Sequence, residues 1–219
     1  MITINISPAI KEKCPKLRLG CIACDVQIAP QSEKLANFIA TESERIQKEL
    51  AIEGISKKTT IQASRKGYKA LGKDPSRYRL SAEALLRRIV KGKGLYQINN
   101  LVDTLNLVSI QTGYSIGGYD LNKIQGEITL GIGEIDEPYQ AIGRGELNIA
   151  NLPVFRDKQG AFGSPTSDSM RTMVSNNTQR FLMLFFDFDA QPDFEQQLQE
   201  AVVLFEQYAA VANIKQWLV

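Results

Sequence analysis

Residues 81–113 read SAEALLRRIVKGKGLYQINNLVDTLNLVSIQTG, and this stretch carries the clearest structural pattern of the 219-residue chain. Its first part predicts a short helix that Ser81 caps and that the GKG of residues 92–94 ends. Its second part predicts a helix over residues 98–112, because apolar residues recur there at helical spacing. The apolar positions are Ile98, Leu101, Val102, Leu105 and Val108.

The opposite face of the second helix is polar in an unusual way. Asn99, Asp103 and Asn106 share that face, because they are spaced by four and then three residues. Short amides and carboxylates there indicate either a binding surface or a buried polar network that holds neighbouring loops. The sequence supports both interpretations equally.

The remaining elements follow from periodicity and breaker residues. Before residue 81 we expect strands at 3–7 and 18–28, a helix that Ser32 caps and that runs to about Leu50, and a helix over 60–71. After residue 112 we expect an irregular Gly-rich stretch at 112–124, short strands within 127–133, 141–149 and 152–157, a central strand at 181–189 that is apolar on both faces, and a closing helix at 193–213.

These elements predict one α+β unit over residues 1–219, with a mixed or antiparallel sheet flanked by helices. No linker, repeat or low-complexity tract divides the chain, so residues 1–59 should be integrated with the rest. The start of the sequence lacks the features of a signal peptide, and no apolar run is long enough to span a membrane. We therefore expect a cytoplasmic protein without a membrane partner.

The composition excludes several kinds of chemistry. The chain has no histidine, three cysteines and a formal net charge of +2. A Ser-His-Asp triad, a Cys-His pair and a His-ligated metal are thereby ruled out. Cys21 and Cys24 form a C-x-x-C, but residues three apart on a strand face opposite sides, which favours buried thiols over metal or redox use. We expect no metal and no cofactor.

Charge is concentrated in one stretch. Residues 57–93 hold twelve basic residues against Asp74 and Glu83, so the rest of the chain is acidic. Such a basic stretch suits a phosphate backbone, although solvated helix faces have the same composition. The candidate RNA-binding residues are Arg65, Lys66, Lys69, Lys73, Arg77, Arg79, Arg87, Arg88, Lys91 and Lys93.

Residues 164–172, SPTSDSMRT, form the most site-like loop of the chain. The loop lies between two predicted strands, so a rigid sheet should hold it. Its hydroxyls and Arg171 suit a phosphate, a ribose or a carboxylate, and Asp168 suits an ammonium group or a bound water. The alternative is an ordinary loop whose hydroxyls satisfy the backbone. Its hydroxyl residues are Ser164, Thr166, Ser167, Ser169 and Thr172.

Four segments, taken in order, resemble the B3/B4 domain of the phenylalanyl-tRNA synthetase β subunit, in the form found in free-standing B3/B4 proteins. The resemblance covers about residues 60–190 and includes residues 81–113, GGYDLNKI at 117–124, the GRGELN and LPVFRD segments, and the SPTSDSMRT loop. One departure is Gly117, which stands where the synthetase motif often has a histidine. The chain has no room for the aminoacylation machinery, so we do not expect a complete phenylalanine-tRNA ligase.

The resemblance implies a pocket between two lobes that accepts the 3′ end of an aminoacyl-tRNA and hydrolyses a wrongly attached amino acid. It places Asn99, Asn100, Asp103 and Asn106 on the helix that lines the pocket, followed by Tyr119 and Asp120. Asp168 or Asp103 would orient the attacking water, and Arg171 with backbone N–H groups would stabilise the oxyanion. The loop hydroxyls would contact the substrate, and the basic stretch would hold the acceptor stem.

Three functions remain open at this point. The first is a trans-editing hydrolase that deacylates mischarged tRNA. Its expected partner is tRNA, and we expect no DNA partner. The second is an RNA- or tRNA-binding module without catalysis, which predicts steeply salt-dependent binding. The third is a sensor that uses the pocket for a free amino acid or nucleotide. Each of these functions requires that the 99–106 helix face and the 164–172 loop line the same cavity, beside basic residues.

Overall fold

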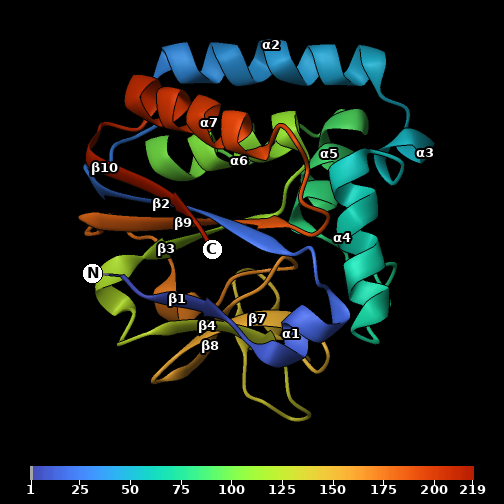
Figure 1. The fold of residues 1–219 in the computed structure, drawn as a ribbon. Coiled ribbons are helices and arrows are strands. Elements are labelled where there is room, and N and C mark those ends of the chain that lie inside the picture. Colours follow the sequence, from blue (N-terminus) through green and yellow to red (C-terminus); the bar gives the residue numbers. More distant parts are fainter. Residues whose placement is uncertain (1) are drawn as a thin grey trace.

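The computed structural model describes residues 2–219, and its strands form two four-stranded sheets that pack face to face (Figure 1). The mixed sheet has the order β1 (Ile4–Ile6), β4 (Ile128–Ile132), β7 (Pro153–Asp157), β8 (Gly160–Gly163), with only β1 and β4 parallel. The antiparallel sheet has the order β10 (Val211–Leu218), β2 (Arg18–Val26), β9 (Arg180–Asp187), β3 (Ile116–Asp120). Two-residue strands β5 (Gln140–Ala141) and β6 (Gly145–Glu146) pair separately.

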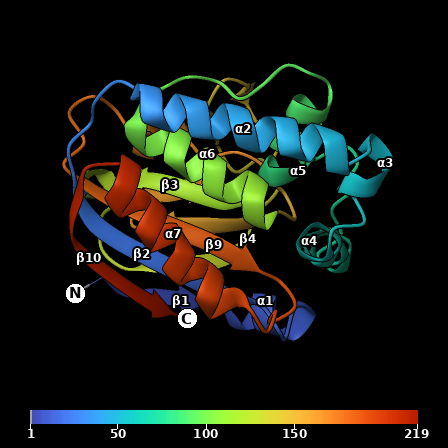
Figure 2. The same ribbon diagram turned by 90° about the horizontal axis from the view of Figure 1, so that it is seen from above.

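Helices cover the face of the antiparallel sheet that the mixed sheet leaves free (Figure 2). That layer consists of α6 (Asn100–Thr112) and α7 (Phe194–Tyr208), with α2 (Glu33–Glu49) outside them. Beside the sheets lie α4 (Thr59–Ala70) and α5 (Ser81–Val90). Short helical segments complete the fold: α1 (Pro8–Lys13), α3 (Ile52–Ile55), η1 (Leu121–Lys123) and η2 (Met170–Thr172).

The predicted α+β class is confirmed, and strand β9 shows why the core has two parts. Leu182, Leu184 and Phe186 face the mixed sheet, whereas Phe181, Met183 and Phe185 face the helices. Because both faces of β9 are buried, its sequence is apolar at every position from 181 to 186. Cys21 and Cys24 likewise lie in different halves of the core as free thiols, as the strand geometry predicted.

Helix α6 is stopped sharply at both ends. The Asn99 side chain accepts a hydrogen bond from the Val102 N–H at 2.8 Å, which satisfies one of the free donors of the first turn. Gly113 ends the helix in the left-handed region, at φ 77°. A Cβ atom at this glycine would lie only 2.5 Å from Thr60 Oγ1, so α6 and α4 meet closely here.

Several predictions about secondary structure were wrong. Residues 116–120 form strand β3 rather than irregular chain, because Gly118 lets Leu105 of α6 pack directly on the strand. Residues 211–213 do not continue the last helix, since the chain turns at Ala210 (φ 48°) and β10 pairs with the open edge of β2. Helix α5 begins at Ser81, but Leu80 occupies the cap position and no side chain caps it.

Of the short strand segment expected within 141–149, the structure has only the two-residue strands β5 and β6, and the remainder is loop. In the part of the chain that the structure describes, no helix is long and apolar enough to cross a bilayer.

Candidate functional site

A cavity of about 710 Å³ opens where α5, α6 and β3 meet the loop that follows β8. Asn106 of α6 and Asp168 of the 164–172 loop both line it. The two stretches that the sequence singled out therefore share one hollow, at the junction between the antiparallel sheet and the loops of the mixed sheet. The cavity is large enough for a nucleoside or an amino acid.

Asp168 is the only carboxylate among the described lining residues. Its Oδ1 accepts a hydrogen bond from the Tyr119 hydroxyl at 2.8 Å, and its Oδ2 accepts one from the Gly118 N–H at 3.2 Å. Burial raises the pKa of Asp168 to about 7, although these two hydrogen bonds pull it in the opposite direction. The carboxyl group therefore titrates close to neutral pH, as a general base should.

Tyr119 is fully buried and reaches Asp168 through a gap that two glycines leave open. A Cβ atom at Gly117 would lie 1.9 Å from the tyrosine hydroxyl, and one at Gly163 would lie 2.1 Å from it. Gly117 is the position at which the related motif often has a histidine. In this chain any side chain at position 117 would displace Tyr119, so the Tyr119–Asp168 hydrogen bond requires a glycine there.

The segment before Asp168 is held from several sides. The Ser164 hydroxyl accepts hydrogen bonds from the N–H groups of Thr166 and Ser167. The Thr166 hydroxyl lies 2.9 Å from the hydroxyl of Tyr68, and the Ser81 N–H donates to the Pro165 carbonyl at 2.8 Å. Ser164, Thr166 and Ser167 line the cavity, but much of their hydrogen-bonding capacity is used within the protein.

The wall beside Asp168 is mostly apolar. It is formed by Val102, Leu105, Ile116, Val174 and Phe181. Asn106 is the one member of the predicted polar helix face that reaches this wall, and within residues 2–219 its carboxamide makes no hydrogen bond. An amide without an internal partner is available to a ligand.

Cationic side chains surround the cavity opening, and we call them the basic rim: Arg79, Arg87, Arg88, Lys91, Lys93 and Arg144. Glu83 is buried beneath this rim. Its carboxylate is 2.9 Å from Arg65 Nη1, 3.0 Å from Arg87 Nε and 3.8 Å from Arg79 Nε. One buried acid therefore pairs with two residues of the basic rim, Arg79 and Arg87, and with Arg65 outside the cavity lining, while Lys91 and Lys93 are exposed.

The other residues predicted on the α6 face hold the fold instead of lining the cavity. Asn99 caps α6, and Asn100 binds the chain at Gln27 and Ala29. Asp103 accepts hydrogen bonds from the Ile98 N–H and from Gln31 Nε2, and burial raises its pKa to about 6. The structure thus separates Asp103 from Asp168, and we assign it no catalytic role.

Arg171 also lies outside the cavity lining. Its guanidinium binds both oxygens of Asp157, at 2.8 and 3.1 Å, and the carbonyl of Gly160 at 3.1 Å. With its donors turned to the mixed sheet, it is not placed to meet an oxyanion beside Asp168.

Three further predicted substrate contacts are structural in the same way. Asp120 accepts from Thr178 Oγ1 and from the Asn122 N–H, and Ser169 accepts from the Arg171 N–H. Thr172 is fully buried below the loop.

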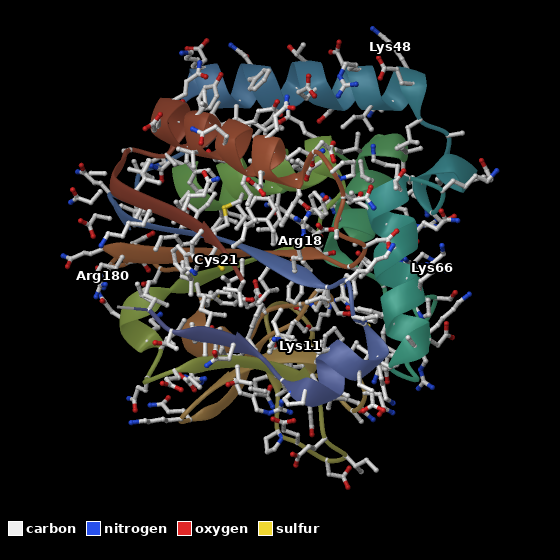
Figure 3. All side chains as sticks on the ribbon, viewed as in Figure 1. Lys11, Arg18, Cys21, Lys48, Lys66 and Arg180 are labelled. Carbon is white, nitrogen blue, oxygen red and sulfur yellow. The ribbon has the colours of Figure 1, made fainter. Side chains whose placement is uncertain are left out.

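The basic stretch divides into separate groups. Lys73 is buried and donates to the carbonyls of Asn148 and Ala150, and burial lowers its pKa to about 8. Lys66 and Lys69 are exposed on α4 and lie outside the cavity lining, and Lys66 points away from the body of the molecule (Figure 3). Arg77 is exposed and also lies outside the cavity lining. The basic residues that line the cavity therefore come mainly from α5 and the loop after it.

Sequence reasoning missed the apolar wall and two residues at the cavity opening, Tyr96 and Ile98. The wall could not be distinguished from core positions, because Val102 and Leu105 continue the apolar stripe of α6. Tyr96 did carry a signal, since it is an aromatic residue shortly after the lysines and glycines of residues 91–94.

Comparison with known proteins identifies the family to which the chain belongs. The model of the B3/4 domain matches residues 63–192, which is more than half of the chain, and the chain belongs to this family. The match includes α5, α6, β3 and the loop with Asp168. No curated protein matches the chain.

Among solved structures, the fold is similar to an N-terminal fragment of the phenylalanyl-tRNA synthetase β subunit from Pyrococcus horikoshii. Sequence identity is 12%, the TM-score is 0.46, and the alignment covers 93% of this chain and 48% of that one. This chain therefore spans about half the length of that structure.

Proposed function

We propose that the chain binds tRNA and hydrolyses the ester that joins an amino acid to the tRNA 3′ end. The observation that carries this proposal is Asp168, a carboxyl group with a pKa of about 7 inside a cavity that has an apolar wall and a basic rim. The wall suits an amino-acid side chain, the rim suits phosphates, and Asp168 lies between them. Membership of the B3/4 domain family, and the resemblance of its motifs to the synthetase domain, agree with a tRNA-related role.

In the proposed reaction, Asp168 removes a proton from a water molecule while the oxygen of that water forms a bond to the ester carbonyl carbon. The tetrahedral intermediate then releases the ribose oxygen, which takes up the proton from Asp168. The products are the free amino acid and a tRNA with its terminal hydroxyl restored. An aminoacyl ester is already activated, so a single general base and correct positioning are sufficient. Tyr119 and the Gly118 N–H orient the carboxylate.

Such an activity compensates for a limit of selective binding. A pocket distinguishes amino acids that differ by one small group by only about 1–3 kcal/mol, so a second hydrolytic site is needed where higher fidelity is required.

The direct test is deacylation of a panel of mischarged tRNAs by the purified chain. We expect hydrolysis of at least one of them, and a rate about 100-fold lower for Asp168→Asn. Asp136→Asn is the matched control, because Asp136 is exposed and outside the cavity lining.

Two other outcomes would replace the proposal. Tight tRNA binding with no hydrolysis above the spontaneous rate would indicate a binding module without catalysis. Binding of a free amino acid or nucleotide, with no affinity for RNA, would indicate a sensor.

A further inference from the structure

The loop after α5 carries an exposed tyrosine to the cavity opening. Tyr96 and Ile98 are each 57% exposed, and Ile142 is exposed across the opening from a different loop. Few large apolar side chains among residues 2–219 are exposed, and these three line the same cavity. Apolar surface gathered at the edge of a cavity indicates that a ligand covers it.

Arg88 fixes the ring of Tyr96. The guanidinium carbon lies 3.7 Å from the centre of the tyrosine ring. Arg88 Nε donates to the Gly94 carbonyl at 2.9 Å, and Nη2 donates to the Lys93 carbonyl at 3.3 Å. Gly94 has a φ of 60°, so a residue that tolerates the left-handed region is needed where the loop turns. The stacked pair is therefore held in place before any ligand arrives.

The charge of Arg88 is not neutralised by the protein. Its partners are carbonyl groups and a ring, and within residues 2–219 it forms no ion pair. Arg87, one residue earlier, differs because its Nε binds the buried Glu83 carboxylate at 3.0 Å. Exposed Lys91 and Lys93 add further positive charge beside the Tyr96 ring.

We propose that Tyr96 and Arg88 form a stacking site for an unpaired nucleobase at the cavity opening, an inference that rests on the proposed function. An exposed aromatic ring within a cationic groove is the arrangement that binds single-stranded nucleic acid, because every base has a π-face and every phosphate a charge. Tyr96 receives the base, Lys91 and Lys93 receive the adjoining phosphates, and the terminal ribose ester extends inward to Asp168.

The experiment uses a short single-stranded RNA that ends in CCA, with 2-aminopurine in place of the terminal adenine. Wild-type protein should quench the 2-aminopurine fluorescence on binding, since stacking on an aromatic ring quenches it. Tyr96→Leu should remove this quenching and weaken binding about 10-fold, whereas Tyr96→Phe should retain both. Tyr208→Leu is the matched control, because Tyr208 also lies beside a cation, with Lys34 Nζ 5.4 Å from its ring centre, but outside the cavity lining.

A second measurement does not depend on the folding of a variant. Wild-type protein should bind an RNA with an abasic terminal residue about 10-fold more weakly than the intact RNA. Unchanged quenching and affinity in Tyr96→Leu, or equal affinity for abasic and intact RNA, would overturn the stacking site. The proposed function would survive either result if deacylation by wild-type protein continued, and it would fail if wild-type protein deacylated no tRNA.

Discussion

Asp168 is the carboxylate of the site, and its surroundings shift its pKa in opposite directions. Burial favours the neutral acid, while hydrogen bonds from Tyr119 and Gly118 favour the carboxylate. The balance leaves a pKa of about 7. The rate of deacylation should therefore rise with pH up to about 7 and level off above it, because the ionised form is the base. A rate that is independent of pH between about 5 and 8, once the spontaneous rate is subtracted, would contradict this role.

Tyr119→Phe tests how Asp168 is tuned. The tyrosine hydroxyl donates to the charged form of Asp168, so its removal should raise the pKa of the carboxyl group further. A hydrogen bond to a charged group contributes about 1.5–3 kcal/mol, which corresponds to a shift of at least about one pH unit. The pH–rate profile of the variant should move to higher pH by this amount. A lower rate with an unmoved profile would mean that Tyr119 is merely structural.

The same pKa has a consequence for stability. In an unfolded chain Asp168 titrates near pH ~4, as aspartate ordinarily does. Between about pH 4 and 7 the folded state therefore retains a proton that the unfolded state has lost, and this group makes the free energy of unfolding fall as pH rises. Asp168→Asn removes this dependence, so its stability relative to wild type should increase by more than about 1 kcal/mol from about pH 5 to about pH 8. Urea unfolding at both pH values measures this difference, and a constant difference would show an unshifted pKa.

At the residue scale, the sequence indicated Asp168 and Asn106 but not their surroundings. Composition suggested that Asp103 and Arg171 were equally good candidates. Only the fold shows that Asp103 binds Ile98 and Gln31, and that Arg171 binds Asp157. These partners are distant in sequence or carry no local pattern, so they were not predictable.

At the scale of elements, α5 organises the basic rim through Glu83. The buried carboxylate faces Arg65, Arg79 and Arg87. Glu83→Gln would leave these arginines without a counter-charge, and since they are partly exposed we expect a loss of about 2 kcal/mol in the free energy of unfolding. Glu49→Gln, which removes the exposed partner of Arg45, is the control and should cost less than about 0.5 kcal/mol. Equal losses in urea unfolding would show that Glu83 is not an anchor.

Elements with local signals were predictable, and those that depend on distant chain were not. Helix α6 was predicted over 98–112 from its apolar stripe, and its end is where expected, whereas its start lies at Asn100 because Asn99 is the cap and not part of a polar helix face. Strand β3 contains Gly117 and Gly118, which look like loop residues and make sense only once Tyr119 and Leu105 are in place. Strand β10 exists because β2 offers an open edge, which the local sequence does not reveal.

At the scale of the whole molecule, the near-neutral net charge hides a basic region at one cavity. RNA binding should weaken as salt rises, because bound phosphates release counterions. Replacing both Lys91 and Lys93 by Gln should reduce the slope of log affinity against log salt by roughly 1.4, the value for two single-strand phosphate contacts. The control is the double replacement of Lys11 and Lys13, which are exposed on α1 outside the cavity lining. Figure 3 shows Lys11 on this helix. Identical salt-dependence slopes for the two double variants would indicate that the basic rim does not bind RNA.

The proposed function depends on one cavity that receives the amino acid and the RNA end together. The most direct measurement is a crystal structure of the chain with an adenosine whose 3′ position carries an amino acid through a stable amide. We predict density for this molecule between Asn106 and Asp168, with the amide carbonyl near the Asp168 carboxylate and the adenine at the cavity opening. Density at another surface, with the cavity empty at saturating concentrations of the compound, would contradict the proposed function.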